Sequence, residues 1–152
     1  MRKQFSSDLY NLMKQDKDII LITADLGFGM LDKIKNELPD QFYNVGAAEQ
    51  VMMDMAVGLS MEGKHVIIYT ITPFLLFRTF ESIRNYIDHE KWPVIMVGSG
   101  RGQDYKDAGF SHEASDDIII KQFKNIEFIS EDVINLKTII YSGKPTYVNL
   151  KR

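Results

Sequence analysis

Short apolar runs alternate along the chain with longer segments in which apolar residues recur at helical spacing. The short runs predict six strands, at residues 19–23, 42–45, 66–70, 94–98, 127–130 and 146–150. Three of them (19–23, 66–70 and 94–98) are almost continuously apolar, which is typical of parallel strands that are covered on both faces. The pattern therefore predicts a sheet whose centre is completely buried.

The longer segments predict helices at residues 2–15, 30–37, 48–61, 76–90, 114–124 and 131–142. In the last one, Ser130 suits the N-cap, and Glu131 and Asp132 suit the first turn. Gly143 suits its end. Strands that alternate with helices in this way predict one α/β domain over residues 1–152, a three-layer sandwich with a mostly parallel sheet flanked by helices.

In open parallel sheets, ligands bind where strands end and loops begin. Four segments that follow predicted strands are therefore of interest: DLGFG at 25–29, NVGAAEQ at 44–50, TPFLLF at 72–77 and GSGRGQDYKDAGFSH at 98–112. All four are predicted to be loops. The glycine-rich composition of the fourth fits a binding loop and a flexible surface loop equally well.

Composition narrows the class of protein. Of the 152 residues, 45% are hydrophobic and 26% are charged, with a net charge of -3, which is ordinary for a soluble globular protein and gives no sign of a nucleic-acid partner. The absence of cysteine excludes disulfides and thiolate chemistry. The N-terminus has no apolar signal region, and no apolar run is long enough to span a membrane. We expect a cytoplasmic protein with no membrane partner.

The usual catalytic motifs are missing. GSGRG is not the dinucleotide fingerprint G-x-G-x-x-G, and there is no Walker A sequence. His65, His89 and His112 have no ligand-like spacing, so we expect no metal site built by this chain alone. His112, at the end of the glycine-rich segment, fits either a helix cap or a substrate contact.

Two other features have competing interpretations. Glu49 stands at the head of an apolar segment, where it either caps a helix or takes part in catalysis. Phe74, Phe77 and Phe80 recur every three residues, and this periodicity alone predicts the buried side of a helix.

Several segments together resemble a known family. FYNVGAAEQVMMDMAVGLSMEGK, at 42–64, resembles the signature around the catalytic glutamate in the pyrimidine-binding domain of transketolase and 1-deoxyxylulose-5-phosphate synthase. Further segments agree with the family in their order and spacing: ADLG at 24–27, PFLLFRTFESIRN at 73–85, VGSGRG at 97–102, GFSHEASDDI at 109–118 and the closing KPTYVNLKR. The resemblance runs from about residue 18 to the end of the chain.

The resemblance implies that Glu49 is catalytic and that thiamine diphosphate is the cofactor. In this family a glutamate hydrogen-bonds N1′ of the aminopyrimidine and favours its imino form, whose nitrogen takes the proton from C2 of the thiazolium ring. Asp25 and Leu26, in ADLG, match cofactor-binding positions.

The resemblance also implies an aromatic pocket for the pyrimidine ring. Phe77 is the residue expected to stack on the ring, with Phe74 and Phe80 beside it. One extra residue separates the two matching parts of this segment, so that Phe74 and Phe77 could exchange roles.

The residues expected to contact the substrate differ in part from the family pattern. His112 and Arg101 match substrate-binding positions. Where the family tends to have GSH and EDG, however, this chain has Gly98-Ser99-Gly100 and Asp107-Ala108-Gly109. Because such polar contacts carry specificity, the departures imply an altered donor or acceptor.

The chain matches only the central domain of a transketolase, and it has no GDG motif for the diphosphate and its metal. The resemblance thus implies one subunit of a split enzyme that transfers a two-carbon ketol or acyl unit from a sugar or 2-oxo acid. A partner subunit would carry the GDG domain and hold Mg²⁺ (or Ca²⁺), in a homodimer or an α2β2 heterotetramer. Two alternatives are a 2-oxo acid decarboxylase or dehydrogenase component and a non-catalytic dimerisation subunit.

Overall fold

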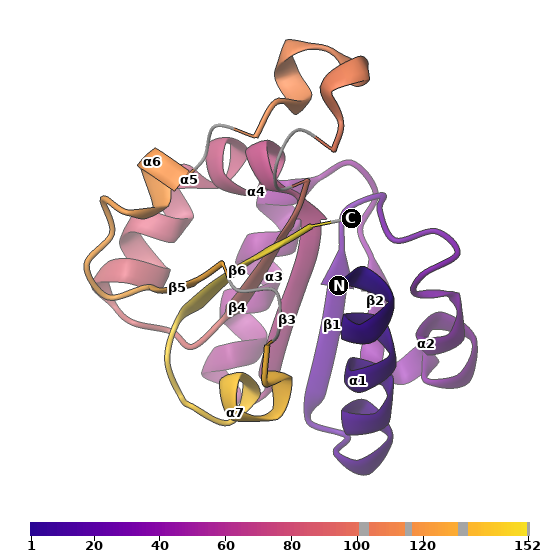
Figure 1. The fold of residues 1–152 in the computed structure, drawn as a ribbon. Coiled ribbons are helices and arrows are strands. Elements are labelled where there is room, and N and C mark those ends of the chain that lie inside the picture. Colours follow the sequence, from indigo (N-terminus) through magenta and orange to yellow (C-terminus); the bar gives the residue numbers. More distant parts are fainter. Residues whose placement is uncertain (101–103, 115–116, 131–133, 152) are drawn as a thin grey trace.

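The core of the molecule is a six-stranded sheet in which every pair of neighbouring strands is parallel (Figure 1). The computed structural model describes residues 1–100, 104–114, 117–130 and 134–151. The strands are β1 (Ile19–Thr23), β2 (Phe42–Asn44), β3 (His65–Ile71), β4 (Ile95–Ser99), β5 (Glu127–Ile129) and β6 (Thr146–Leu150). All six predicted strands are present, and their order in the sheet is β2-β1-β3-β4-β6-β5.

Burial follows position in the sheet. Every residue of β1, β4 and β6 is buried, whereas the edge strands β2 and β5 have no fully buried residue. The continuous apolar runs therefore lie at the centre, as the sequence predicts.

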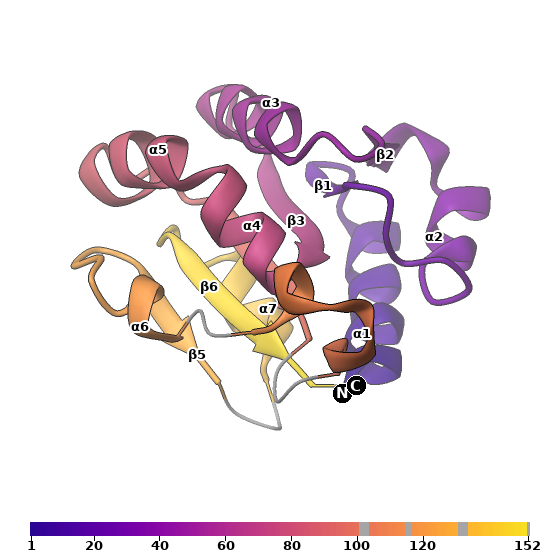
Figure 2. The same cartoon turned by 90° about the horizontal axis from the view of Figure 1, so that it is seen from above.

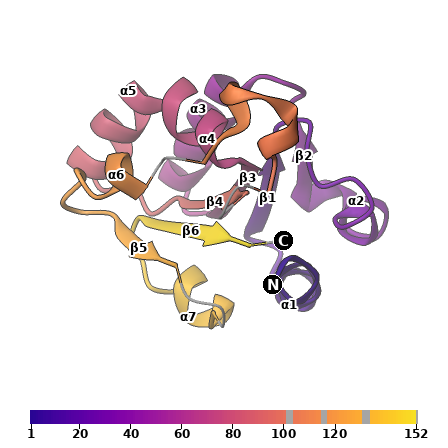
Figure 3. The same cartoon turned by 45° about the horizontal axis from the view of Figure 1, so that its top comes forward.

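Helices cover both faces of the sheet, which confirms the predicted three-layer α/β fold (Figures 2 and 3). The helices are α1 (Arg2–Gln15), α2 (Asp32–Glu37), α3 (Glu49–Met61), α4 (Thr72–Arg78), α5 (Phe80–Ser82), α6 (Asp117–Ile120) and α7 (Leu136–Ile140). The shorter turns are η1 (Pro39–Gln41), the π-helix η2 (Ile83–His89), η3 (Lys106–Ala108) and η4 (Phe110–His112).

Each face has its own core. One core is built from α3, α4, η2 and α6 against the sheet, and the other from α1, α2 and α7. In α3 the apolar residues Met52, Met53, Ala56 and Val57 are buried against the sheet.

The strand order creates a switch point between β1 and β3. After β1 the chain moves outward to β2, and it then crosses back to add β3 on the other side of β1. Loops diverge at the carboxyl ends of such a strand pair and leave a crevice that ligands use. The loop after β1 and the segment after β3 are therefore placed to form a site.

The predicted helix at 76–90 is wrong in its start and in its continuity. Helix α4 begins directly after β3 at Thr72, with Pro73 in its first turn, so TPFLLF is helical and not a loop. The α-helix is interrupted at Thr79, whose hydroxyl donates to the carbonyl of Leu75 at 2.5 Å. Such back-bonding competes with the helix ladder and bends it.

The last two predicted helices are shorter than expected. Helix α6 occupies only Asp117–Ile120 of the predicted 114–124. Helix α7 begins at Leu136, where Asn135 Oδ1 accepts from the Thr138 N–H at 3.1 Å. The expected first turn at Glu131 and Asp132 lies outside the described residues.

Candidate active site

Glu49 is a buried carboxylate at the start of a helix. It is the first residue of α3, with Ala48 at the N-cap, so Glu49 does not cap the helix. The preceding turn requires φ +71° at Gly46, a backbone conformation that suits glycine. The Glu49 side chain is only 3% exposed, and its Oε2 accepts a hydrogen bond from the Arg78 guanidinium at 2.8 Å.

Arg78 comes from the last turn of α4 and lies between Glu49 and an aromatic ring. Its Cζ stands 3.7 Å from the centroid of the Phe74 ring, one helical turn earlier on α4. A guanidinium over a ring face is attracted by the π-system. Sequence reasoning missed Arg78, although its i, i+4 spacing from Phe74 was a usable signal.

His112 extends this cluster. Its ring meets the Phe74 ring edge-on, with centroids 4.9 Å apart and an interplanar angle of 66°. The Ser111 hydroxyl lies 3.1 Å from His112 Nδ1. Glu49, Arg78, Phe74 and His112 therefore form a continuous set of contacts, and three of these four residues are sites predicted from the sequence.

The other two aromatic candidates lie differently. Phe77 is 52% exposed and Phe80 is 43% exposed, so the buried helix face predicted from periodicity is wrong for both. The buried residues of α4 are instead Thr72, Pro73, Leu75 and Leu76. Phe80 packs against Phe123, with ring centroids 5.5 Å apart.

Asp25 and Leu26 occupy the loop after β1. Asp25 has φ +47°, a left-handed conformation that Asp and Asn tolerate better than most residues. The Asp25 N–H and the Gly46 N–H both donate to Asn44 Oδ1, at 3.1 and 3.0 Å. One side chain thus joins the Asp25 loop to the turn before Glu49. Sequence reasoning did not identify Asn44, because its contact with Asp25, which lies 19 residues away, is fixed only by the sheet.

The two residues that depart from the family pattern, Gly100 and Ala108, lie in different surroundings. Gly100 has φ +116°, and a Cβ there would stand 2.8 Å from Cδ2 of Tyr105, so a larger residue does not fit. Ala108 lies exposed in η3. Arg101, the other predicted substrate contact, lies outside the described residues.

The structure adds two findings on metals and membranes. Within the described ranges, no three His, Asp or Glu side chains converge where they could hold a metal ion. None of the helices in that part of the chain is long and apolar enough to cross a membrane.

Comparison with known proteins gives a consistent result. The family model of the transketolase pyrimidine-binding domain matches residues 1–123, so the match begins well before residue 18, where the resemblance was expected to start. A solved split-gene transketolase, described as an inactive β4 tetramer, superposes with a TM-score of 0.83 and 27% identity, covering 98% of this chain and 50% of that one.

Two similar proteins align with all or nearly all of the chain. The transketolase C-terminal section of Methanocaldococcus jannaschii is 33% identical over 160 residues, which is 100% of this chain and 50% of the relative. One of the subunits of the apulose-4-phosphate transketolase of Phocaeicola vulgatus is 28% identical over 158 residues, with coverage of 99% and 51%. The chain thus spans about half the length of these relatives.

Proposed function

The chain belongs to the family of transketolase pyrimidine-binding domains, and we propose that it is the pyrimidine-binding subunit of a split thiamine-diphosphate-dependent transketolase. The enzyme would transfer a two-carbon ketol or acyl unit from a small sugar or 2-oxo acid. A partner subunit would hold the diphosphate and its metal, in an assembly such as an α2β2 heterotetramer. Two relatives that are named as a section and a subunit of a transketolase support this architecture.

The observation that carries the proposal is a buried carboxylate beside an aromatic ring. Glu49 is enclosed, and its hydrogen-bond partner Arg78 is half exposed and stacked on Phe74. A planar heterocycle with a ring nitrogen fits this arrangement, because it needs one hydrogen-bonding acid and one aromatic face. The residues present therefore fit an aminopyrimidine.

Each residue has a defined task in this proposal. Glu49 would hold a proton in a hydrogen bond to the pyrimidine ring nitrogen, in a site from which burial excludes water. Phe74 would lie against the ring, while Phe77 and Phe80 would line the rim. The loop of Asp25 and Leu26 would border the cofactor. When bound, thiamine diphosphate supplies a carbon nucleophile on its thiazolium ring.

In this proposal, the pyrimidine ring nitrogen would replace Arg78 as the partner of Glu49. The guanidinium is half exposed, so water can solvate it after the exchange, and the ring nitrogen would take its place as the hydrogen-bond partner of the buried Glu49. His112, which contacts Phe74, would then face the substrate beyond the ring.

The architecture is tested by mixing this chain with a partner subunit that carries the GDG domain, together with thiamine diphosphate and Mg²⁺. We expect a stable complex and ketol transfer, neither of which the chain gives alone. Failure to form a complex in a pull-down would count against a split enzyme.

The role of Glu49 is tested in the same assembly with Glu49→Gln. Because general acid–base catalysis contributes at least about 100-fold, we expect turnover to fall by that factor or more while the fold is kept. Glu62→Gln, at the exposed end of α3, is the matched control. Unchanged turnover in Glu49→Gln would favour a dimerisation subunit.

A further inference from the structure

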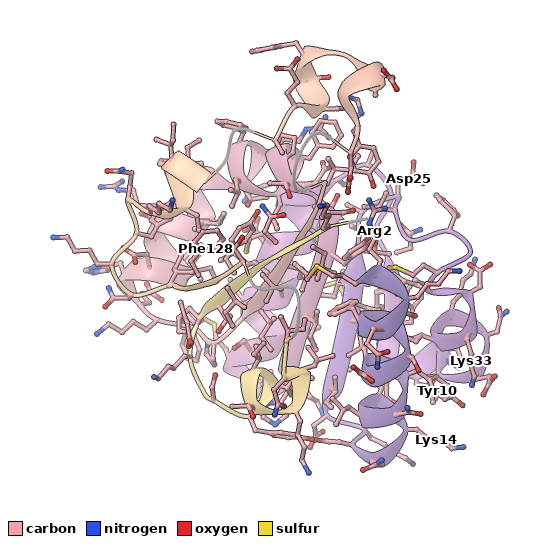
Figure 4. All side chains as sticks on the ribbon, in the orientation of Figure 1. Arg2, Tyr10, Lys14, Asp25, Lys33 and Phe128 are labelled. Carbon is pink, nitrogen blue, oxygen red and sulfur yellow. The ribbon has the colours of Figure 1, made fainter. Side chains whose placement is uncertain are left out.

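A second feature lies at the carboxyl end of the sheet, on the face covered by α1. It is a cavity of about 510 Å³, within the range of roughly 300–1,000 Å³ that is usual for small-molecule sites. Its main lining residues are Arg2, Leu26, Phe28, Met30, Tyr69 and Tyr105. Figure 4 labels Arg2, the first residue of α1, and Asp25, the residue before Leu26. Leu26 therefore connects this cavity with the loop proposed to border the cofactor.

Two nitrogens of the arginine in the cavity wall already have partners. Arg2 Nη2 donates to Asp104 Oδ2 at 2.8 Å, and Nη1 donates to the Tyr105 hydroxyl at 3.3 Å. Burial by itself would lower the pKa of Arg2, but the hydrogen bond to Asp104 and the neighbouring Tyr105 raise it overall, so the side chain stays charged. An anion in the cavity would have to compete with the Asp104 carboxylate for that charge.

The remaining wall is apolar and aromatic. Burial raises the pKa of Tyr69, so its hydroxyl stays neutral, and that side chain hydrogen-bonds Ser99. Tyr105 also reaches Ser99, with hydroxyl oxygens 3.1 Å apart, and its ring occupies the space that a side chain at Gly100 would fill. Lys3 stands exposed at the rim, where water screens its charge.

We propose that this cavity binds an uncharged, mainly apolar part of the substrate, such as a deoxygenated carbon chain or a ring, and that Asp104 excludes phosphate from it. The assignment to the substrate rests on the proposed function, whereas the binding preference of the cavity does not. Asp104 acts here by neutralising Arg2, so it is a residue that determines specificity without touching the reacting atoms.

The preference can be measured on the isolated chain by NMR titration with two probes, benzyl alcohol and inorganic phosphate. In the wild type, benzyl alcohol should shift the resonances of Leu26, Tyr69 and Tyr105, and phosphate should leave them unchanged. Asp104→Asn keeps an oxygen acceptor for Arg2 but removes the negative charge. Phosphate should then bind at least about tenfold more tightly than in the wild type, since charge-assisted hydrogen bonds to a freed guanidinium are strong.

Asp107→Asn, in the same loop and exposed, changes the net charge equally and should not gain phosphate binding. Tyr105→Ala should weaken benzyl alcohol binding, which keeps the proposal testable even if Asp104→Asn folds poorly. Phosphate binding in the wild-type cavity, or benzyl alcohol shifts elsewhere only, would overturn the proposal. The Glu49→Gln assay remains independent of these results, so that the two proposals can fail separately.

Discussion

Two arginine–carboxylate pairs lie near the carboxyl end of the sheet. In one pair only the acid is buried, whereas in the other both side chains are enclosed. Both have an N···O distance of 2.8 Å. In the pair formed by Arg78 and Glu49, the arginine is 46% exposed and the acid 3% exposed. In the pair formed by Arg2 and Asp104, both side chains are largely enclosed, at 18% and 14%.

The difference in solvent exposure indicates that the two ion pairs have different roles. Arg78 can move to water and leave Glu49 for another hydrogen-bond donor, so the first pair is exchangeable. Arg2 and Asp104 are both partly enclosed, so their separation would leave both charges poorly solvated rather than one. The first pair therefore suits a site that must accept a cofactor, and the second suits a fixed wall.

The largest effect is expected from Arg78→Ala. Without Arg78, the Glu49 carboxylate is buried with its observed partner removed, which should lower the free energy of unfolding by about 3 kcal/mol. Glu49→Gln leaves a neutral acceptor and a half-exposed arginine, so we expect a loss of about 1 kcal/mol or less. Urea denaturation measures both, with Arg84→Ala on the exposed side of η2 as the control. If both variants lost the same free energy of unfolding, the burial of Glu49 would not make the contributions of the two side chains unequal.

A smaller and more symmetric effect is expected at the second pair. Arg2→Ala and Asp104→Ala should each cost about 1–2 kcal/mol, because each removes a charge-assisted hydrogen bond from its partner. The double variant should lose less than the sum, by about 1 kcal/mol in a double-mutant cycle. Lys3→Ala, next to Arg2 but exposed, is the control. Additive losses would mean that the two side chains are not coupled.

The smallest effect is expected at Asn44, which holds the backbone around Glu49. Asn44→Ala removes the acceptor of the Asp25 and Gly46 N–H groups and should cost about 1 kcal/mol. Amide hydrogen exchange at these two positions should become faster, whereas Asn44→Asp should retain protection. Asn36→Ala, exposed on α2, provides the comparison. Unchanged exchange would show that the two loops are ordered without Asn44.

The parts of the fold that follow from local pattern were predicted well. The residues of β1 and of α1 agree with the prediction, because continuous apolar runs and helical spacing reflect local burial. The break at Thr79 was not predicted, since a threonine hydroxyl bonds back to a carbonyl only in a particular rotamer and helix. The start of α7 was not predicted either, because the sequence pattern does not show that Asn135 accepts from the Thr138 N–H.

The candidate site, like the fold, was predicted only where it depends on contiguous sequence. Glu49 and Phe74 were predicted, because they lie in contiguous segments that resemble the family. The contacts of Glu49 with Arg78 and of Phe74 with His112 were not, since they depend on how α3, α4 and η4 pack together. Phe77 and Phe80 share the spacing of Phe74 but not its surroundings, and spacing alone could not separate them.

The sequence by itself determined the α/β architecture, the family and the acid that the cofactor proposal depends on. Each of these depends on residue types at fixed separations along one chain. The tertiary structure alone decided which arginine meets which carboxylate, and how much water each pair retains. Those pairings join residues 29 and 102 positions apart. Their strength depends on solvent exposure, which only the packed sheet and helices determine.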